Sequence, residues 1–113
     1  MSARLEARLW LLQRASAAAL AFCVLVHLVT MIYAVRGGLG AADILARTRG
    51  NVAWAIFYGF FVTMVSVHAA IGLRTILGEW AGLRGRAGLV VAIIVALSLF
   101  AFGLRAVGAV VRP

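Results

Sequence analysis

The sequence predicts an all-α protein that crosses a membrane three times. Hydrophobic residues make up 65% of the 113 residues and charged residues only 12%. The hydrocarbon core of a bilayer is about 30 Å thick, which requires about 20 apolar residues of helix. Three runs without a charged side chain approach or exceed that length: residues 15–35, 51–73 and 87–104. The chain is short enough for one domain, with helices expected at about 10–35, 51–78 and 87–111.

The net charge of +8 comes from eleven arginines, with no lysine. In a soluble protein this charge would suggest nucleic-acid binding, but here the arginines lie near the ends of the predicted helices. Arginines at such positions reach lipid head groups, so we expect no nucleic-acid partner. Six arginines fall on one side and five on the other, too even a division for the positive-inside rule to set the orientation. The single cysteine, Cys23, cannot form an intrachain disulfide, and the sequence has no cysteine cluster for an iron–sulfur centre.

The first helix, at about 10–35, follows a short amphipathic lead-in. We interpret it as a retained helix, because its apolar run is longer than that of a typical signal peptide and no small-residue cleavage pattern follows. It opens with Gln13-Arg14-Ala15-Ser16 and contains His27. Eleven residues separate Ser16 from His27, which places both on one face of a helix at about 100° per residue.

The loop at 36–50 is rich in glycine, and a short interfacial turn is expected near Asp43 to Arg47. The second helix begins with several aromatic residues typical of the membrane interface. Glycines mark a tight polar turn at 79–86. The third helix offers few polar side chains, so we expect it to serve mainly in packing.

The second helix carries a polar stripe made of His68, Gly72, Thr75 and Glu79. An imidazole at membrane depth is costly unless it is paired or ligated, so His68 is a candidate functional residue. Gly72 lies on the same face one turn later and removes the side chain beside the imidazole. A flat ring bound to His68 could therefore approach the backbone closely.

This pattern, His68-x3-Gly72-x-Arg74 followed by Glu79 and Trp80, resembles the second helix of the membrane-anchor subunits of succinate dehydrogenase and fumarate reductase (respiratory complex II). The resemblance implies that His68 ligates a b-type haem, with Gly72 and Arg74 beside the cofactor. It also implies that Glu79 and Trp80 border the quinone site. The family usually has Asp at the position of Glu79 and Tyr or Phe at that of Trp80.

The entry of the first helix is similar to that of the same family. There the arginine lies by the quinone and the haem carboxylates, which makes Arg14 a candidate contact for either and Ser16 a hydroxyl donor beside it. The alternative is that Arg14 only anchors the helix end. His27 is a candidate second haem ligand, or else a histidine hydrogen-bonded to a neighbouring helix.

The two histidines are expected at different depths. Measured from the face with Arg14 and Glu79, His27 lies about 20 Å deep and His68 about 9–16 Å deep. They should therefore not share one iron, and each would pair with a histidine of a partner chain. The chain would then be half of a haem-binding helical bundle, completed by a second anchor subunit or another copy of itself. One haem on His68, with His27 structural, is the alternative.

The resemblance implies a membrane-anchor subunit of a succinate:quinone oxidoreductase in the bacterial inner membrane, with its N-terminus in the cytoplasm. It would pass electrons between the iron–sulfur subunit, itself joined to a flavoprotein subunit, and a membrane quinone. Alone it would not be catalytic, and either succinate oxidation or fumarate reduction fits.

Three other interpretations are a haem-free structural anchor, a different di-haem cytochrome b and a small oligomeric transporter. The transporter is disfavoured because the acidic residues all lie at or beyond helix ends: Glu6, Asp43 and Glu79.

Overall fold

The computed structural model describes residues 2–113 and confirms an all-α protein with three helices long and apolar enough to cross a membrane. The helices, with one short addition in the first loop, are α1 (Ala3–Arg36), α2 (Ala41–Thr48), α3 (Val52–Trp80) and α4 (Gly85–Val111).

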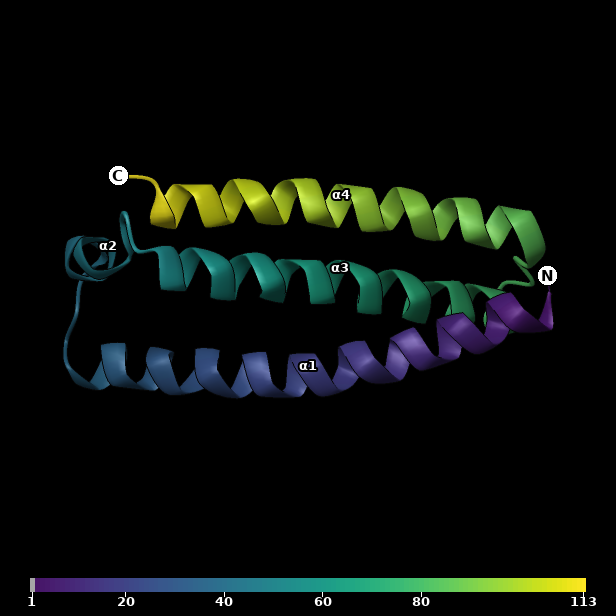
Figure 1. Ribbon diagram of the computed structural model, residues 1–113, viewed down its shortest axis with the longest axis horizontal. Helices are drawn as coiled ribbons and strands as arrows, with labels where there is room; N and C mark the ends of the chain where they lie inside the picture. The colour runs from purple at the N-terminus through teal and green to yellow at the C-terminus, as the bar shows by residue number, and fades with distance from the viewer. Residues whose placement is uncertain (1) are drawn as a thin grey trace.

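The three long helices run antiparallel, with α3 in the middle (Figure 1). One side of α3 packs against α1 and the other against α4, while α2 lies across the end of the assembly where α1 leads into α3. Most large apolar side chains on the outer faces are exposed. This distribution suits helices surrounded by lipid, whose tails are as apolar as the side chains.

The helix ends follow local capping. α1 begins at Ala3, earlier than predicted, because the Ser2 hydroxyl accepts a hydrogen bond from the Leu5 N–H and no glycine or proline interrupts the chain before Gly37. The amphipathic lead-in is therefore the first part of α1. The end of α1 is where the sequence predicted it, with Gly38 at φ +66° in the following loop.

The expected interfacial turn is a two-turn helix, α2, and its C-terminal end is fastened to the last turn of α4. The Thr48 hydroxyl donates to the Val110 carbonyl over 2.7 Å, and the Gly50 N–H donates to the Val111 carbonyl over 2.7 Å. These bonds satisfy carbonyls that a helix C-terminus otherwise leaves unpaired. We call this pair of bonds the α2–α4 latch.

Close approach holds α3 against α4. A Cβ atom added at Gly103 of α4 would lie only 2.4 Å from the Val62 Cγ1 atom of α3. Small residues that let helices approach closely are a main source of association in membranes. Gly103 is therefore the position where α4 meets α3 without room for a side chain.

We expect Gly103→Ala to destabilise the protein by about 1–3 kcal/mol, because the stiff Val62 side chain must move. The control is Gly59→Ala, since a Cβ at this α3 position meets nothing within 4 Å. That variant should be unchanged or about 0.5–1 kcal/mol more stable. Denaturant unfolding in detergent measures both, and equal stability of the two variants would contradict the packing argument.

Candidate functional site

His68 lies half-buried on α3, where its imidazole contacts α1. Its Nδ1 atom is 3.3 Å from the Ser16 hydroxyl oxygen. Ser16 is completely buried, and its hydroxyl also lies 3.0 Å from the main-chain carbonyl of Gln13.

This chain of contacts selects one tautomer of His68. A carbonyl can only accept, so the Ser16 hydroxyl donates its single hydrogen to Gln13. Ser16 then accepts from the Nδ1–H of His68, which leaves a lone pair on Nε2. In a metal-ligating histidine, the hydrogen bond made by one ring nitrogen determines that the other nitrogen is free to ligate the metal.

An open groove of about 640 Å³ runs beside His68, between α1 and the C-terminal half of α3. Its lining includes four of the predicted site residues, His68, Gly72, Arg14 and Arg74. Gln13 and Thr75 also line it. Ser16 is not part of the lining, since it lies buried behind His68.

Gln13 is a site residue that the sequence analysis did not select. Its amide covers Gly72, because a Cβ atom added there would lie 3.3 Å from the Gln13 Nε2 atom. Its Oε1 atom is buried and has no hydrogen-bond partner among the described residues. A buried polar atom without a partner is costly, so this oxygen needs a donor that the described residues do not supply.

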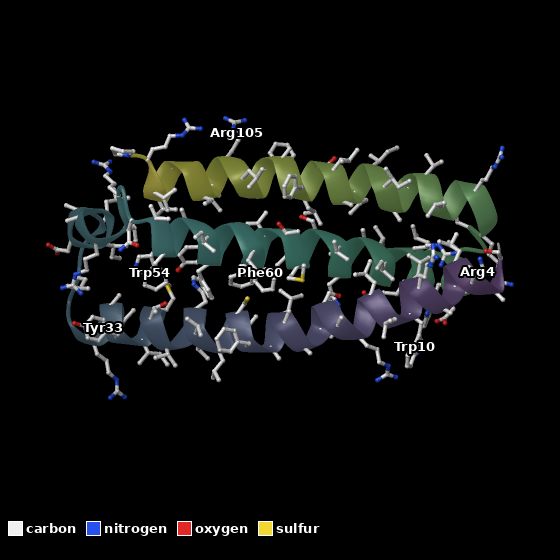
Figure 2. The ribbon with its side chains drawn as sticks, in the orientation of Figure 1. Arg4, Trp10, Tyr33, Trp54, Phe60 and Arg105 are labelled. Carbon is white, nitrogen blue, oxygen red and sulfur yellow. The ribbon has the colours of Figure 1, made fainter. Side chains whose placement is uncertain are left out.

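Two arginines border the groove, and only one of them is in an ion pair. The Arg14 guanidinium lies over the Trp10 ring, 4.8 Å from its centroid, and makes no ion pair within residues 2–113. Trp10 points away from α3 (Figure 2). By contrast, Arg74 Nη2 lies 2.6 Å from Glu6 Oε1 and Nη1 lies 3.4 Å from Oε2.

The Glu6–Arg74 pair ties the start of α1 to α3. With 34 residues, α1 is about 51 Å long, so its first turns extend beyond an apolar core of about 30 Å. Glu6 precedes the uncharged run that starts at residue 15 and lies in this extension. The hydrogen bond from Arg74 lowers the pKa of Glu6 below its ordinary value of 4.5.

The remaining two quinone-site candidates lie beyond the His68 groove. Glu79 is exposed and lines an adjacent hollow of about 360 Å³, which shares Glu6, Arg74 and Thr75 with the His68 groove. Trp80 is 86% exposed and lines neither.

His27 lies toward the other end of the α1–α3 contact. Its Nδ1 atom is 3.2 Å from the Tyr58 hydroxyl, and its ring meets Tyr58 and Phe61 edge to face at 5.8 Å. His27 also lines an apolar groove of about 500 Å³ formed mainly by α3 and α4. The Tyr58 hydroxyl has no other partner within residues 2–113, so it can donate or accept, and the His27 tautomer is not set.

The two histidines lie at different depths, as predicted. His68 is level with Ser16, whereas His27 is eleven residues further along α1. Eleven residues of helix span about 16 Å, so the two imidazoles of one chain cannot ligate the same iron.

A sequence model of the succinate dehydrogenase/fumarate reductase transmembrane subunit family matches residues 1–104. The chain belongs to this family. No curated protein and no solved structure matches it. As a transmembrane subunit of succinate dehydrogenase or fumarate reductase, it works with the other subunits of complex II.

Gln13 and Tyr58 make polar contacts at the two histidines of this transmembrane subunit, and sequence analysis selected neither residue. Gln13 could have been found by its spacing, three residues before Ser16 on the same helix face. Tyr58 was included among the interfacial aromatics, and only the packing of α1 on α3 shows that it meets His27.

We expect Glu6→Gln to loosen the start of α1 by removing the ion pair with Arg74. Because the pKa of Glu6 is lowered, the pair contributes above the ordinary value of 4.5 and is lost as the pH falls through the lowered pKa. Hydrogen exchange of residues 3–9 should therefore be faster in the variant than in the parent at pH 7. The two proteins should exchange alike once Glu6 is protonated.

The matched control is Glu79→Gln, because Glu79 makes no ion pair within residues 2–113. Exchange of residues 3–9 should be unaffected by this change. Faster exchange in both variants at pH 7 would mean that overall charge, and not the pair, protects the segment.

Proposed function

We propose that the chain is a haem b-binding membrane-anchor subunit of a succinate:quinone oxidoreductase, passing electrons between the iron–sulfur subunit and a membrane quinone. The observation that carries the proposal is His68, held by Ser16 in the tautomer with a free Nε2, beside an open groove. A histidine placed in this way at membrane depth suits ligation.

The residues around His68 fit a haem. The described residues contain no group of three or more His, Cys, Asp or Glu side chains that could hold a bare metal ion. A porphyrin needs only one or two axial protein ligands, which a single histidine from this chain and one from a partner supply. The unpaired guanidinium of Arg14 suits the carboxylates of such a group.

A bound haem b would supply one-electron redox chemistry. The chain's own residues would bind the haem and orient its ligand. Ser16 fixes the imidazole of His68, and Gly72, which lacks a Cβ atom, leaves room for the Gln13 amide. Arg74, already neutralised by Glu6, shapes the boundary between the groove and the adjacent hollow.

Quinone chemistry is assigned to the same end of the protein. Reduction of a quinone to a quinol requires protons, and Glu79 is exposed to water and lines the hollow next to the His68 groove. Its carboxylate can therefore carry a proton from water toward a quinone oxygen, while Arg14 contacts the head group from α1. The indole N–H of Trp80 is a donor to a quinone carbonyl once a partner chain covers it. Ser16 is assigned to His68, because its hydroxyl is already used twice.

The proposal extends to a second haem at His27. His27 lines an apolar groove large enough for part of a flat ring, and the depth difference from His68 requires a separate iron. A second anchor subunit or another copy of this chain would contribute the other ligands. The bond to Tyr58 supports the alternative in which His27 only joins α1 to α3.

Under this proposal the partners are the iron–sulfur and flavoprotein subunits, and the site is in a bacterial inner membrane. The end with Arg14 and Glu79, where α1 begins, faces the cytoplasm and the iron–sulfur subunit. The same arrangement serves succinate oxidation or, in reverse, fumarate reduction.

The first experiment measures haem per chain by pyridine haemochrome, after purification with the subunits that co-purify. Two haems shared across a pair give about one haem per chain. Changing either histidine to alanine, His27→Ala or His68→Ala, should then remove about half. The control Tyr58→Phe keeps the imidazole of His27 and should retain the second haem.

If the parent holds about half a haem per chain and only His68→Ala removes it, His27 is structural. An intact, quinone-reactive complex without haem would overturn the cytochrome assignment and leave a haem-free anchor.

A separate test concerns Ser16. We expect Ser16→Ala to weaken haem binding about 10- to 100-fold, as is typical when the partner of a metal-ligating histidine is removed. Ser66→Ala is the matched control. Like Ser16, Ser66 is buried, but it belongs to α3 and donates only to the Val62 carbonyl of its own helix. Transfer of haem to apomyoglobin measures both, and equal loss from the two variants would contradict an orienting role for Ser16.

A further inference from the structure

A cationic hollow lies at the opposite end of the protein from the His68 groove. It has a volume of about 390 Å³ and is formed by the last turns of α4 and the segment after α2. Its lining contains three arginines and no acidic side chain: Arg49, Arg105, Gly108, Ala109, Arg112 and Pro113.

Two of the arginines lie at the C-terminal end of α4, Arg105 within the helix and Arg112 directly after it. Arg105 and Arg112 are seven residues apart, so they share a face and are separated by about 10 Å along the axis. Gly108 lies between them, and its lack of a side chain leaves room for the Arg112 head. A Cβ atom added there would lie 3.1 Å from Arg112 Nε and Nη2, which shows that the Arg112 head folds back over Gly108. Arg105 projects from the side of α4 that faces away from α3 (Figure 2).

The third arginine is brought to the hollow by the α2–α4 latch. Arg49 lies between Thr48 and Gly50, whose bonds to Val110 and Val111 fasten this segment to the end of α4. The position of Arg49 is therefore fixed by a side-chain hydrogen bond before it and a main-chain hydrogen bond after it.

The three guanidinium groups have no internal acceptor. Basic residues near a helix C-terminus often bond to its last carbonyls. Here the carbonyls of Val110 and Val111 accept from Thr48 and Gly50, and that of Gly108 accepts from the Arg112 N–H. Within residues 2–113, the guanidiniums of the three arginines make no hydrogen bond and no ion pair. The only acidic side chain at this end, Asp43, accepts from the Gly40 N–H and does not line the hollow.

We propose that Arg49, Arg105 and Arg112 bind a phosphate group, of the kind carried by the head group of an anionic phospholipid. A guanidinium fork matches phosphate oxygens bidentately, and three such groups face one hollow at the end of a membrane-spanning helix. This site is independent of the haem and quinone assignments.

A free phosphate would offer the same chemistry, but the surface beside the hollow favours a lipid. The stripe that carries Arg105 continues toward the middle of α4 through Leu97 and Ile94, at helical spacing. These side chains are 65% and 58% exposed. An acyl chain could follow this apolar track while its phosphate rests among the arginines.

The test is a lipid titration followed by native mass spectrometry, on the chain purified in neutral detergent with its co-purifying subunits. Phosphatidylglycerol should bind in preference to phosphatidylcholine, whose choline cancels the phosphate charge. Each single change to glutamine, Arg49→Gln, Arg105→Gln or Arg112→Gln, should weaken phosphatidylglycerol binding about fivefold, and the triple variant about a hundredfold.

The matched control removes the same charge at the other end of the protein, in the triple variant Arg4→Gln, Arg8→Gln and Arg86→Gln. These arginines are exposed and make no ion pair within the described residues. The control should keep phosphatidylglycerol binding. Equal weakening in the two triple variants, or no preference over phosphatidylcholine, would overturn the site, and the single variants decide the matter if a triple variant fails to fold.

Inorganic phosphate distinguishes the two sources of the ligand. If millimolar phosphate leaves phosphatidylglycerol bound, the site holds a lipid. If phosphate displaces the lipid in the parent and binds more weakly to the triple variant, the site stands and its ligand is the free anion.

Discussion

Polar contacts between α1 and α3 are the interactions on which this structure depends. Lipid tails are as apolar as leucine, so burial of apolar surface does little to join helices within a bilayer, and close packing and interhelical hydrogen bonds take its place. α4 meets α3 by close approach at Gly103. α1 is joined to α3 mainly through polar pairs, among them Ser16 with His68 and His27 with Tyr58.

The same pairs define the functional surface. Because the Nδ1 atom of His68 is bonded to α1, only Nε2 is left for a ligand, and the groove lies beside that contact, between α1 and α3. In the proposed haem site, helix association and haem ligation would therefore use different nitrogens of one imidazole ring. His68 cannot be replaced without affecting both, which is why its neighbour Ser16 is the more informative position.

Much of the fold follows from composition, because three long uncharged runs separated by glycine-rich polar segments allow few other arrangements. His68 and His27 could be selected from the sequence, because an ionisable side chain at membrane depth is costly unless it is paired or ligated. Gln13 could have been selected only by its spacing to Ser16. Tyr58 could not, since its contact with His27 arises from the register of α1 on α3, which no local pattern records. Helical spacing placed Glu79 on the face of His68, but the groove ends before it and Glu79 lines the next hollow. The early start of α1 reflects the cap at Ser2, which lies outside the apolar run.

The α2–α4 latch also has a consequence for biosynthesis. It joins residues 62 positions apart in the chain, Thr48 and Val110, so it can close only after the ribosome has produced nearly all of α4. Until then the loop between α1 and α3 lacks its hydrogen bonds to α4, and Arg49 is not held beside Arg105 and Arg112. The arginine cluster is thus a late product of membrane insertion, complete only when the last transmembrane helix has found its position.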